Sequence, residues 1–265
     1  MTYKPIPDMW AQGDAYERYV GRWSREVATR FLPMLAARPG KRWVDVGCGT
    51  GALSAAILNL CSPSAVTGIE PSEGFLKTAR STLPQKVVLL QGSATSIPLD
   101  DNAADVVVSG LVLNFVPDQA AGLTEMFRVT AAGGTIGAYV WDYAERMELM
   151  RYFWDAATAV DPRASRMDES TRFPICHPEN LVQLFVEAGL RNVAVTAIDI
   201  PTPFNNFDDY WEPFLGGQGA APAYAMSLSE SARERLREEL FTCVPREGDG
   251  SIALIARAWA VRGTK

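Results

Sequence analysis

The spacing of apolar positions changes several times along the chain, and these changes predict helices and strands in alternation. From residue 14 to residue 36 the apolar side chains recur at helical spacing, which predicts one or two helices ahead of a sheet. Short β-rich runs follow, each separated from the next by a helical segment. Strands are expected at 42–47, 65–70, 86–92, 105–110 and 134–141, and helices at 51–60, 72–82 and 118–130. The alternation predicts βαβ units and a parallel sheet.

The later part of the chain is less regular. Helices are expected at 145–160, 178–188 and 228–242, and strands at 193–200 and 251–261. No long crossover motif separates the last two strands, so one of them is expected to run antiparallel on the sheet edge. The pattern as a whole predicts an α/β fold with a doubly wound, mostly parallel, seven-stranded sheet and helices ahead of it.

One stretch carries the clearest chemical pattern, RWVDVGCGTGALS at residues 42–54, where an apolar run ends in three glycines and turns helical. Such a turn places backbone N–H groups at a helix N-terminus, and glycine lets a ligand approach closely. No Gly-Lys-Ser/Thr follows, which excludes a P-loop. The glycines alone leave nicotinamide dinucleotides and other adenosine cofactors open.

Two carboxylates narrow that choice. Asp45 lies on the strand two residues before Gly47, where it would repel a pyrophosphate but suits an ammonium or sulfonium group. Glu70 ends the next strand, where a carboxylate can accept both ribose hydroxyls of an adenosine. Small residues and Asn114 follow the third and fourth strands, at the edge where the far end of the cofactor is expected.

Four motifs stand in order: VDVGCGTG, GIEPS, GSATSIPLDDNAADVVVSGLVLNFVPD and RVTAAGGTIGAYVW. Together they resemble the class I S-adenosylmethionine-dependent methyltransferases of the UbiE-like small-molecule type, over residues 40–141. The N-terminal YERYVGRWSR also resembles the helix that precedes the sheet in one branch of these enzymes. The resemblance implies a Rossmann-like methyltransferase fold, an enzyme that methylates, and S-adenosyl-L-methionine as its cofactor.

The resemblance assigns the methionine end of the cofactor to two loops. The first is the glycine loop, with Asp45 supporting it. Its expected contacts are Gly47, Cys48, Gly49 and Gly51. The second follows the fourth strand, where Leu111 and Asn114 fall at positions that line the methionine end in the family.

The adenosine end is assigned to the ends of the second and third strands. Glu70 would bind the ribose, and the expected adenine contacts are Pro71, Ser72, Ser93 and Ala94. Many family members have Asp where this chain has Ser93, whose hydroxyl accepts the hydrogen bond of the adenine amino group less strongly than a charge does. Tyr19, Arg22 and Trp23 would close over the cofactor, with helix packing and surface charge as the alternative.

We expect a single methyltransferase domain over 1–265, with a helical cap at 1–40, a cofactor-binding half at 41–141 and a substrate-side half at 142–265. Lid insertions are expected at 142–176 and 201–245, where aromatic residues gather. Most of these aromatics are expected to be ordinary core, and a minority to line an apolar substrate pocket, because ligands bind at this edge of open α/β sheets. The candidates are Trp141, Tyr143, Phe204, Tyr210 and Trp211.

Methyl transfer from a sulfonium is an in-line displacement of an activated donor, so the protein mainly supplies proximity and alignment. The expected acceptor is a small, partly apolar organic molecule. A base is needed only if the acceptor holds its proton firmly. The single histidine, His177, is the candidate base, with capping of the helix that starts at Pro178 as the alternative.

Composition and charge limit the kinds of partner that the chain is expected to bind. The formal net charge of −6 disfavours a nucleic-acid partner, and NFVP at 114–117 lacks the Asn-Pro-Pro-aromatic order that base methylation uses. No run of 18 apolar residues and no secretory leader are found, so no membrane span is expected. Four scattered cysteines suit a cytoplasmic location and indicate no metal site. A NAD(P)-dependent oxidoreductase and a cofactor-binding module without turnover remain as alternatives.

Overall fold

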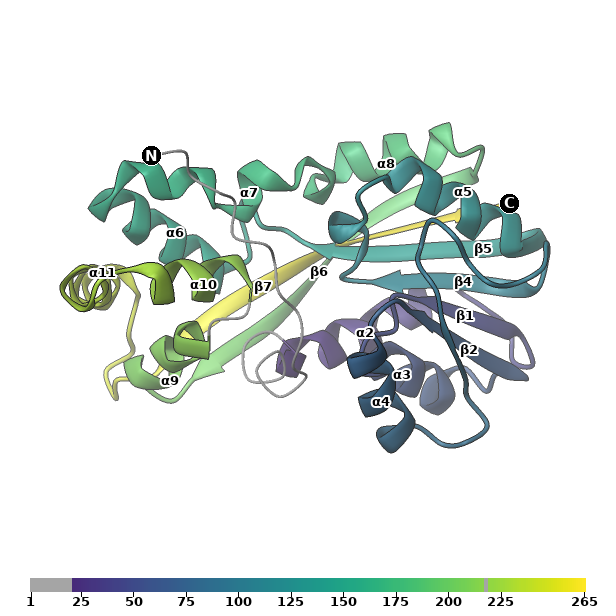
Figure 1. Cartoon of the computed structure of the whole chain (residues 1–265), viewed down its shortest axis with the longest axis horizontal. Coiled ribbons are helices and arrows are strands. Elements are labelled where there is room, and N and C mark those ends of the chain that lie inside the picture. The colour runs from purple at the N-terminus through teal and green to yellow at the C-terminus, as the bar shows by residue number, and fades with distance from the viewer. Residues whose placement is uncertain (1–20, 217–218) are drawn as a thin grey trace. The chain divides into compact units, whose positions relative to one another are not determined.

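The computed structural model describes residues 21–216 and 219–265 (Figure 1). These residues divide into two compact units. Unit 1 consists of residues 21–23, Asp142–Pro174 and Asp199–Arg257, and unit 2 of Ser24–Trp141, Ile175–Ile198 and Ala258–Lys265. Tyr19, which we expected at the cofactor, lies outside the described residues.

Unit 2 contains most of the predicted alternation. Its strands are β1 (Arg42–Val46), β2 (Ala65–Glu70), β3 (Val88–Gln91), β4 (Ala104–Gly110) and β5 (Thr130–Trp141). Its helices are α3 (Ala52–Leu60), α4 (Glu73–Thr82), α5 (Gln119–Val129) and α8 (Pro178–Glu187), with a 3-10 turn at Leu113–Phe115. Three elements have residues in both units: α2 (Arg22–Met34), β6 (Arg191–Phe204) and β7 (Ile252–Thr264). The predicted strands and the helices between them are therefore confirmed, with ends that differ by a few residues.

The strands described form one seven-stranded sheet in the order β3-β2-β1-β4-β5-β7-β6, which confirms the predicted fold class. β1 pairs in parallel with both β2 and β4. The order of the strands reverses between β1 and β4, so the loops that leave these two strands start side by side. Figure 1 shows α3 and α4 on one face of this part of the sheet and α5 and α8 on the other.

The antiparallel strand is β7, which pairs with β5 from Thr135↔Thr264 to Trp141↔Ala258. It lies between β5 and β6, so our expectation of an antiparallel strand on the sheet edge was wrong in its placement. The edge belongs to β6, which is more exposed along its length and contains Pro201 and Pro203. Proline has no N–H to donate, so a strand that carries two is better tolerated at an edge than inside a sheet.

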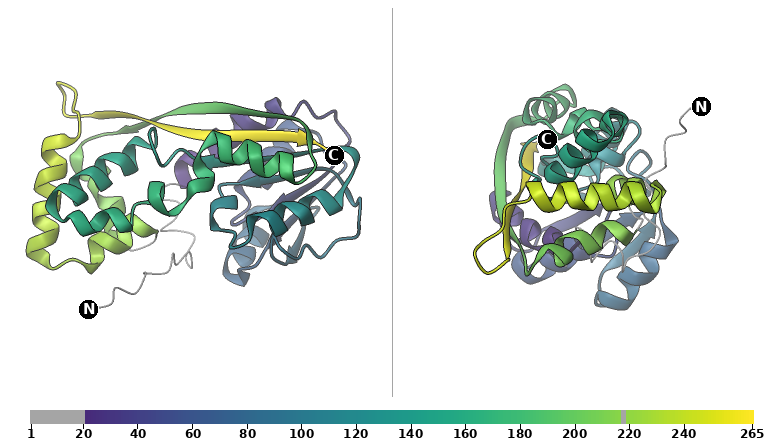
Figure 2. Two further views of the ribbon diagram at one scale, coloured as in Figure 1. Left: turned by 90° about the horizontal axis from the view of Figure 1, so that it is seen from above. Right: turned by 90° about the vertical axis from the view of Figure 1, so that its left-hand side faces the viewer.

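Unit 1 is helical, with α6 (Glu148–Val160), α7 (Glu169–Arg172), α9 (Phe207–Trp211), α10 (Ala220–Ser227) and α11 (Glu230–Cys243). Helix α11 (yellow-green) packs on α6 (teal), as Figure 2 shows. The core of unit 1 is aromatic. Phe153 stacks on Phe214 with ring centroids 4.4 Å apart and meets Trp154 edge-on at 5.1 Å. Two acidic side chains are buried beside this core. Asp168 pairs with Arg151 at 2.7 Å, and Glu169 accepts a hydrogen bond from the indole N–H of Trp154.

Candidate cofactor site in unit 2

The glycine loop after β1 is tied to the end of β2. The backbone N–H groups of Gly47 and Cys48 both donate to the carbonyl oxygen of Ile69, at 2.8 and 3.0 Å. Gly51, which begins α3 as its N-cap, donates to the carbonyl of Cys48 at 2.8 Å. The loop is therefore a tight turn whose first amides are used internally, which leaves the amide of Gly49 at its tip.

Gly47 and Gly49 are glycines for different reasons. Gly47 has φ +75°, and a Cβ added there would lie 2.5 Å from Cγ1 of Val112 on the loop after β4. Gly49 has φ +53°, and a Cβ added there would meet nothing within 4 Å. Gly47 therefore lets two loops pack together, whereas Gly49 faces open space. That open space at the tip of the loop is where a bound ligand would find room.

Asp45 is the buried carboxyl behind the loop, with 1% of its surface exposed. The hydroxyl of Ser54, on the first turn of α3, donates to Oδ2 at 2.7 Å. Oδ1 has no hydrogen-bond partner within the described chain. Burial raises the pKa of Asp45 to about 7, against the lowering effect of the Ser54 hydrogen bonds, and the charge of Glu70 adds to the rise. Ser54 was not predicted; its only sequence signal is a polar residue on the buried side of a short apolar helix.

Glu70 is buried at the end of β2 and links two turns. Oε2 accepts the amide N–H of Gly49 at 3.1 Å, and Oε1 accepts the amide N–H of Ser72 at 2.9 Å. Burial raises the pKa of this carboxyl, and the two backbone hydrogen bonds oppose the rise. The predicted ribose-binding residue thus lies directly beside the predicted methionine-binding loop.

The loop after β4 brings the other predicted residues of the methionine end to the glycine loop. Leu111 has φ +60°, which is strained for a residue with a branched side chain, and its N–H donates to the carbonyl of Tyr139 at 2.8 Å. Asn114 is buried, and its Nδ2 has no hydrogen-bond partner within the described chain. Val112, which seals Gly47, was missed, because an apolar residue in an apolar run carries no distinguishing signal.

The predicted adenine contacts lie at the ends of β2 and β3. Pro71 is exposed and its carbonyl accepts from Gln91 Nε2 at 3.1 Å, while the hydroxyl of Ser72 caps α4 by accepting from the N–H of Phe75. Ser93 and Ala94 are half-buried. The Ser93 hydroxyl lies 3.0 Å from that of Thr95, and either can donate. The hydrogen-bonding capacity of Ser93 is thus partly used inside its own turn.

Cys48, at the centre of the glycine loop, is buried against β2. A Cβ added at Gly68 would lie 2.8 Å from its Sγ, so the thiol occupies the space above that glycine. Burial, with the charges of Asp45 and Glu70, raises the pKa of the thiol well above its usual range. The thiol therefore stays protonated and acts as a small apolar group.

His177 is exposed and occupies the N-cap position of α8, directly before Pro178. It thus occupies the capping position that the alternative expected, but its side chain makes no capping hydrogen bond. Its carbonyl oxygen accepts the N–H of Leu181 at 3.2 Å, and the first helical residue, proline, has no N–H that needs a cap. A catalytic role for His177 stays a prediction.

The aromatic candidates for a substrate pocket are all buried. Trp141 ends β5 in unit 2, and the other four belong to unit 1. The Tyr210 hydroxyl donates to the carbonyl of Leu149 at 3.0 Å, and the Phe204 ring lies 5.4 Å from that of Tyr210. Trp211 lies 6.1 Å from Phe214, and Tyr143 lies 6.0 Å from Phe173.

Two further residues predicted to contact the cofactor, Arg22 and Trp23, lie on helix α2. The ring of Trp23 packs edge-on against Phe204 with centroids 6.0 Å apart, so within unit 1 this side chain takes part in aromatic packing. Arg22 is the first residue of α2 and directly precedes Trp23. The helix-packing alternative thus accounts for the position of the Trp23 ring.

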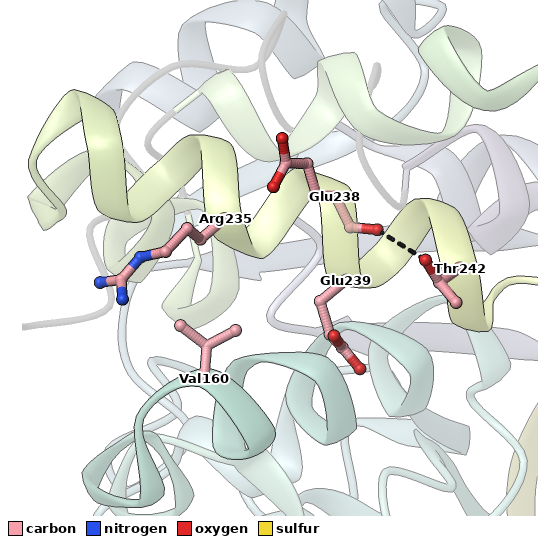
Figure 3. A pocket seen from close by; sticks show the side chains of 5 residues that line it. All are labelled: Val160, Arg235, Glu238, Glu239 and Thr242. Atoms are coloured by element: carbon pink, nitrogen blue, oxygen red, sulfur yellow. Dashed lines mark hydrogen bonds between the residues drawn. The ribbon is translucent and has the colours of Figure 1, made fainter.

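A pocket of about 330 Å³ in unit 1 contains none of the predicted residues. Val160 of α6 and four residues of α11 line it: Arg235, Glu238, Glu239 and Thr242 (Figure 3). The Thr242 hydroxyl donates to the backbone carbonyl of Glu238 at 3.1 Å, as the dashed line in Figure 3 marks. Its mostly charged lining does not match the apolar, aromatic pocket expected for an acceptor.

Two kinds of site are absent from the described residues. No group of three or more His, Cys, Asp or Glu side chains there could hold a metal ion. None of the helices there combines the length and apolarity that crossing a bilayer requires.

Comparisons with known proteins identify the family and the fold. A family model described as a methyltransferase domain matches residues 44–138. A demethylmenaquinone methyltransferase of Staphylococcus aureus (strain JH9) is 30% identical over 179 residues, which are 63% of this chain and 74% of that relative. The YcgJ protein of Bacillus subtilis superposes with a TM-score of 0.56 at 19% identity, over 92% of this chain and 98% of that one. The cyclase SpnF superposes with a TM-score of 0.52 at 16% identity, over 90% and 80%.

The chain belongs to the class I S-adenosylmethionine-dependent methyltransferases of the UbiE-like type. It is an enzyme of that class, and S-adenosyl-L-methionine is its cofactor. The two solved structures support the fold alone. The donors and acceptors of the site suit such a cofactor, because Asp45 on β1 has a buried carboxylate oxygen, and Asn114 after β4 a buried amide group, with no hydrogen-bond partner among the described residues. A buried polar atom without a partner costs about 1–3 kcal/mol, and a bound ligand can supply the missing contact.

Proposed function

We propose that the protein transfers the methyl group of S-adenosylmethionine to a small, partly apolar organic acceptor by in-line displacement. The observation that carries this proposal is the charge of the glycine-loop site. Asp45 and Glu70 are both buried there, and their described hydrogen-bond donors are neutral, namely the Ser54 hydroxyl and the amides of Gly49 and Ser72. A ligand with an ammonium and a sulfonium group complements such a site, whereas a pyrophosphate would be repelled.

The residues of unit 2 take the following roles in this proposal. Asp45 and Asn114 hold the methionine end, with the open tip at Gly49 giving it room. Glu70 accepts hydrogen bonds from the ribose hydroxyls, and the turn containing Ser93 receives the adenine. When bound, the cofactor supplies an activated methyl group. The chain's own contribution is to fix the orientation of that group and to exclude water from it.

We assign recognition of the acceptor to aromatic side chains of unit 1. The name of the Staphylococcus relative, a demethylmenaquinone methyltransferase, supports an apolar, ring-containing acceptor. Tyr143 and Trp211 are the positions to test first. Tyr210 and Phe204 are instead held in the aromatic core. No base is assigned, because a phenol-like or acidified carbon acceptor loses its proton readily.

A cytoplasmic location is part of the proposal. Cys48, Cys61, Cys176 and Cys243 are all free thiols in the structure, which suits a reducing compartment.

The first test separates cofactor classes by thermal unfolding. S-adenosylmethionine and S-adenosylhomocysteine at saturating concentration should raise the melting temperature, and NAD⁺ and NADP⁺ should not. A rise with a nicotinamide dinucleotide alone would overturn the proposal.

The second test concerns turnover, because the fold is shared with a protein named as a cyclase. Purified protein is incubated with S-adenosylmethionine and a panel of quinols, phenols, amines and nucleosides, and the mass of each acceptor is measured. A gain of one methyl group on an apolar ring acceptor is expected. Methylation of amines or nucleosides only would contradict the acceptor class, and binding without methylation of any acceptor would favour the module without turnover.

A further inference from the structure

Glu70 makes two hydrogen bonds within the protein besides the ribose contact that we assign to it. Its two carboxylate oxygens already accept two backbone amides, from Gly49 at 3.1 Å and from Ser72 at 2.9 Å. Gly49 is the tip of the glycine loop and Ser72 is the N-cap of α4. One side chain therefore joins the loop after β1 to the turn after β2.

The two hydrogen bonds require that both terminal atoms of the side chain be acceptors. A glutamine at this position would offer one carbonyl oxygen and one NH₂ group, and the NH₂ would face a backbone N–H. An aspartate would be one methylene shorter. Glutamate satisfies both amides, and each of its oxygens keeps a second lone pair for a ligand hydroxyl. The backbone contacts and the ribose contact can therefore exist together.

The amide of Gly49 lies at a loop tip that has little packing around it. Gly49 has φ +53°, and nothing lies within 4 Å of its Cβ position, so side-chain packing does not hold it. The first amides of the loop bond to Ile69, on the other side of the turn. At the tip, Thr82 Oγ1 donates to the carbonyl of Thr50 at 3.3 Å, and the amide of Gly49 donates to Glu70. Glu70 is thus the described side chain that holds the Gly49 amide.

We propose that Glu70 is a positioning residue for the glycine loop: it holds the amide of Gly49, and with it the open tip, in the conformation that receives the methionine end of the cofactor. This role adds to the ribose contact of the proposed function and rests on that function. It makes a distinct prediction, because a positioning role acts on ligands that have no ribose hydroxyls.

The test is a cycle of variants and ligands, measured by isothermal titration calorimetry. The variants are E70Q and E70A, with E73Q as the control, because Glu73 is an exposed glutamate on α4 that pairs with Arg80. The ligands are S-adenosylhomocysteine and its 2′,3′-dideoxy analogue. If Glu70 only binds the ribose, E70A leaves the affinity for the dideoxy analogue unchanged. If it positions the loop, E70A and E70Q each weaken binding of that analogue by about tenfold, the loss expected for one hydrogen bond to a charged group.

A second readout needs no ligand. Hydrogen exchange of the Gly49 amide, followed by NMR in the cofactor-free protein, should become at least several-fold faster in E70Q and stay unchanged in E73Q. E70Q is expected to fold, since it keeps the size of the side chain, and circular dichroism checks this. Unchanged exchange at Gly49, or unchanged affinity for the dideoxy analogue, would overturn the positioning role. Failure of the wild type to bind S-adenosylhomocysteine at all would instead count against the proposed function.

Discussion

Unit 2 and unit 1 bury apolar side chains in different ways. In unit 2, β-branched residues such as Val44 and Val107 sit in register on neighbouring parallel strands, and polar residues gather where the strands end. In unit 1, aromatic rings pack on one another, and buried acids such as Glu169 lie among them. The first arrangement is regular and repeats a local pattern. The second depends on which distant rings meet, so its chemistry cannot be located from spacing.

The largest expected effect is a loss of stability from a substitution in unit 1 that leaves cofactor binding in unit 2 unchanged. Phe153 is fully buried against Phe214, Trp154 and Tyr224. Phe153→Ala should therefore lower the free energy of unfolding by about 3–5 kcal/mol. The affinity of the folded protein for S-adenosylhomocysteine should stay within about twofold, because the predicted cofactor residues of the two loops belong to unit 2.

Phe241→Ala is the matched control, since Phe241 belongs to the same unit but is 48% exposed. It should cost less than about 1 kcal/mol by denaturant unfolding. A loss of cofactor affinity in Phe153→Ala as large as its loss of stability would show that the two units do not divide these roles.

The sequence predicted unit 2 well for a physical reason. A parallel strand buried on both faces reads as an apolar run, and a glycine turn followed by a helix reads as a break in that run, so the local pattern was enough to locate Asp45, Gly49 and Glu70. The partners of these residues could not be located in this way. Ser54 reaches Asp45 only because α3 folds back over β1, and Val112 reaches Gly47 only because β4 lies beside β1.

Unit 1 shows where prediction from sequence ends. The aromatic candidates could be named from composition, but not the roles that packing gives them. The hydrogen bond of Tyr210 to Leu149 joins residues 61 positions apart, and the contact of Trp23 with Phe204 joins residues 181 positions apart. The order of β6 and β7 in the sheet could not be predicted from the local pattern either, because it depends on which of the two strands tolerates the exposed position at the edge.

The next expected effect separates the two glycines of the loop. Gly47→Ala forces a methyl group to within 2.5 Å of Val112 and a residue with a side chain into φ +75°, so it should cost about 2–4 kcal/mol of stability. Gly49→Ala has free space and should cost only about 1–2 kcal/mol of stability, from its left-handed backbone, while weakening cofactor binding more than Gly47→Ala does at equal folded fraction.

Val112→Ala provides the check, because it removes the methyl groups that the new Cβ would strike. The double variant Gly47→Ala/Val112→Ala should recover part of the stability lost by Gly47→Ala, measured by thermal unfolding in a double-mutant cycle. Strict additivity of the two substitutions would show that Val112 is not what makes position 47 a glycine.

The smallest expected effect is a pH dependence of cofactor binding. The carboxyl of Asp45 has a raised pKa of about 7, so it is largely neutral below that pH and ionised above it. Only the ionised form attracts the ammonium group of the ligand. Affinity for S-adenosylhomocysteine should therefore fall by about tenfold as the pH drops from 8 to 6, which corresponds to about 1.4 kcal/mol.

Asp45→Asn removes the titrating group and should flatten this dependence, with weaker binding at pH 8 and little further loss at pH 6. Calorimetric titrations at several pH values measure both profiles. The same slope in wild type and Asp45→Asn would assign the pH dependence to another group, of which the buried Glu70 is the nearest candidate.

The place of β7 in the sheet has a consequence for how the molecule is made on the ribosome. β7 is the last of the described strands along the chain, yet it lies between β5 and β6. During synthesis β6 emerges before the strand that joins it to the sheet exists, so its backbone must wait unpaired while α9, α10 and α11 are still being added. The parallel part from β1 to β5 can form earlier, because all of its strands precede residue 142. The glycine loop and its two carboxyls can therefore assemble on the nascent chain before the far side of the sheet is completed.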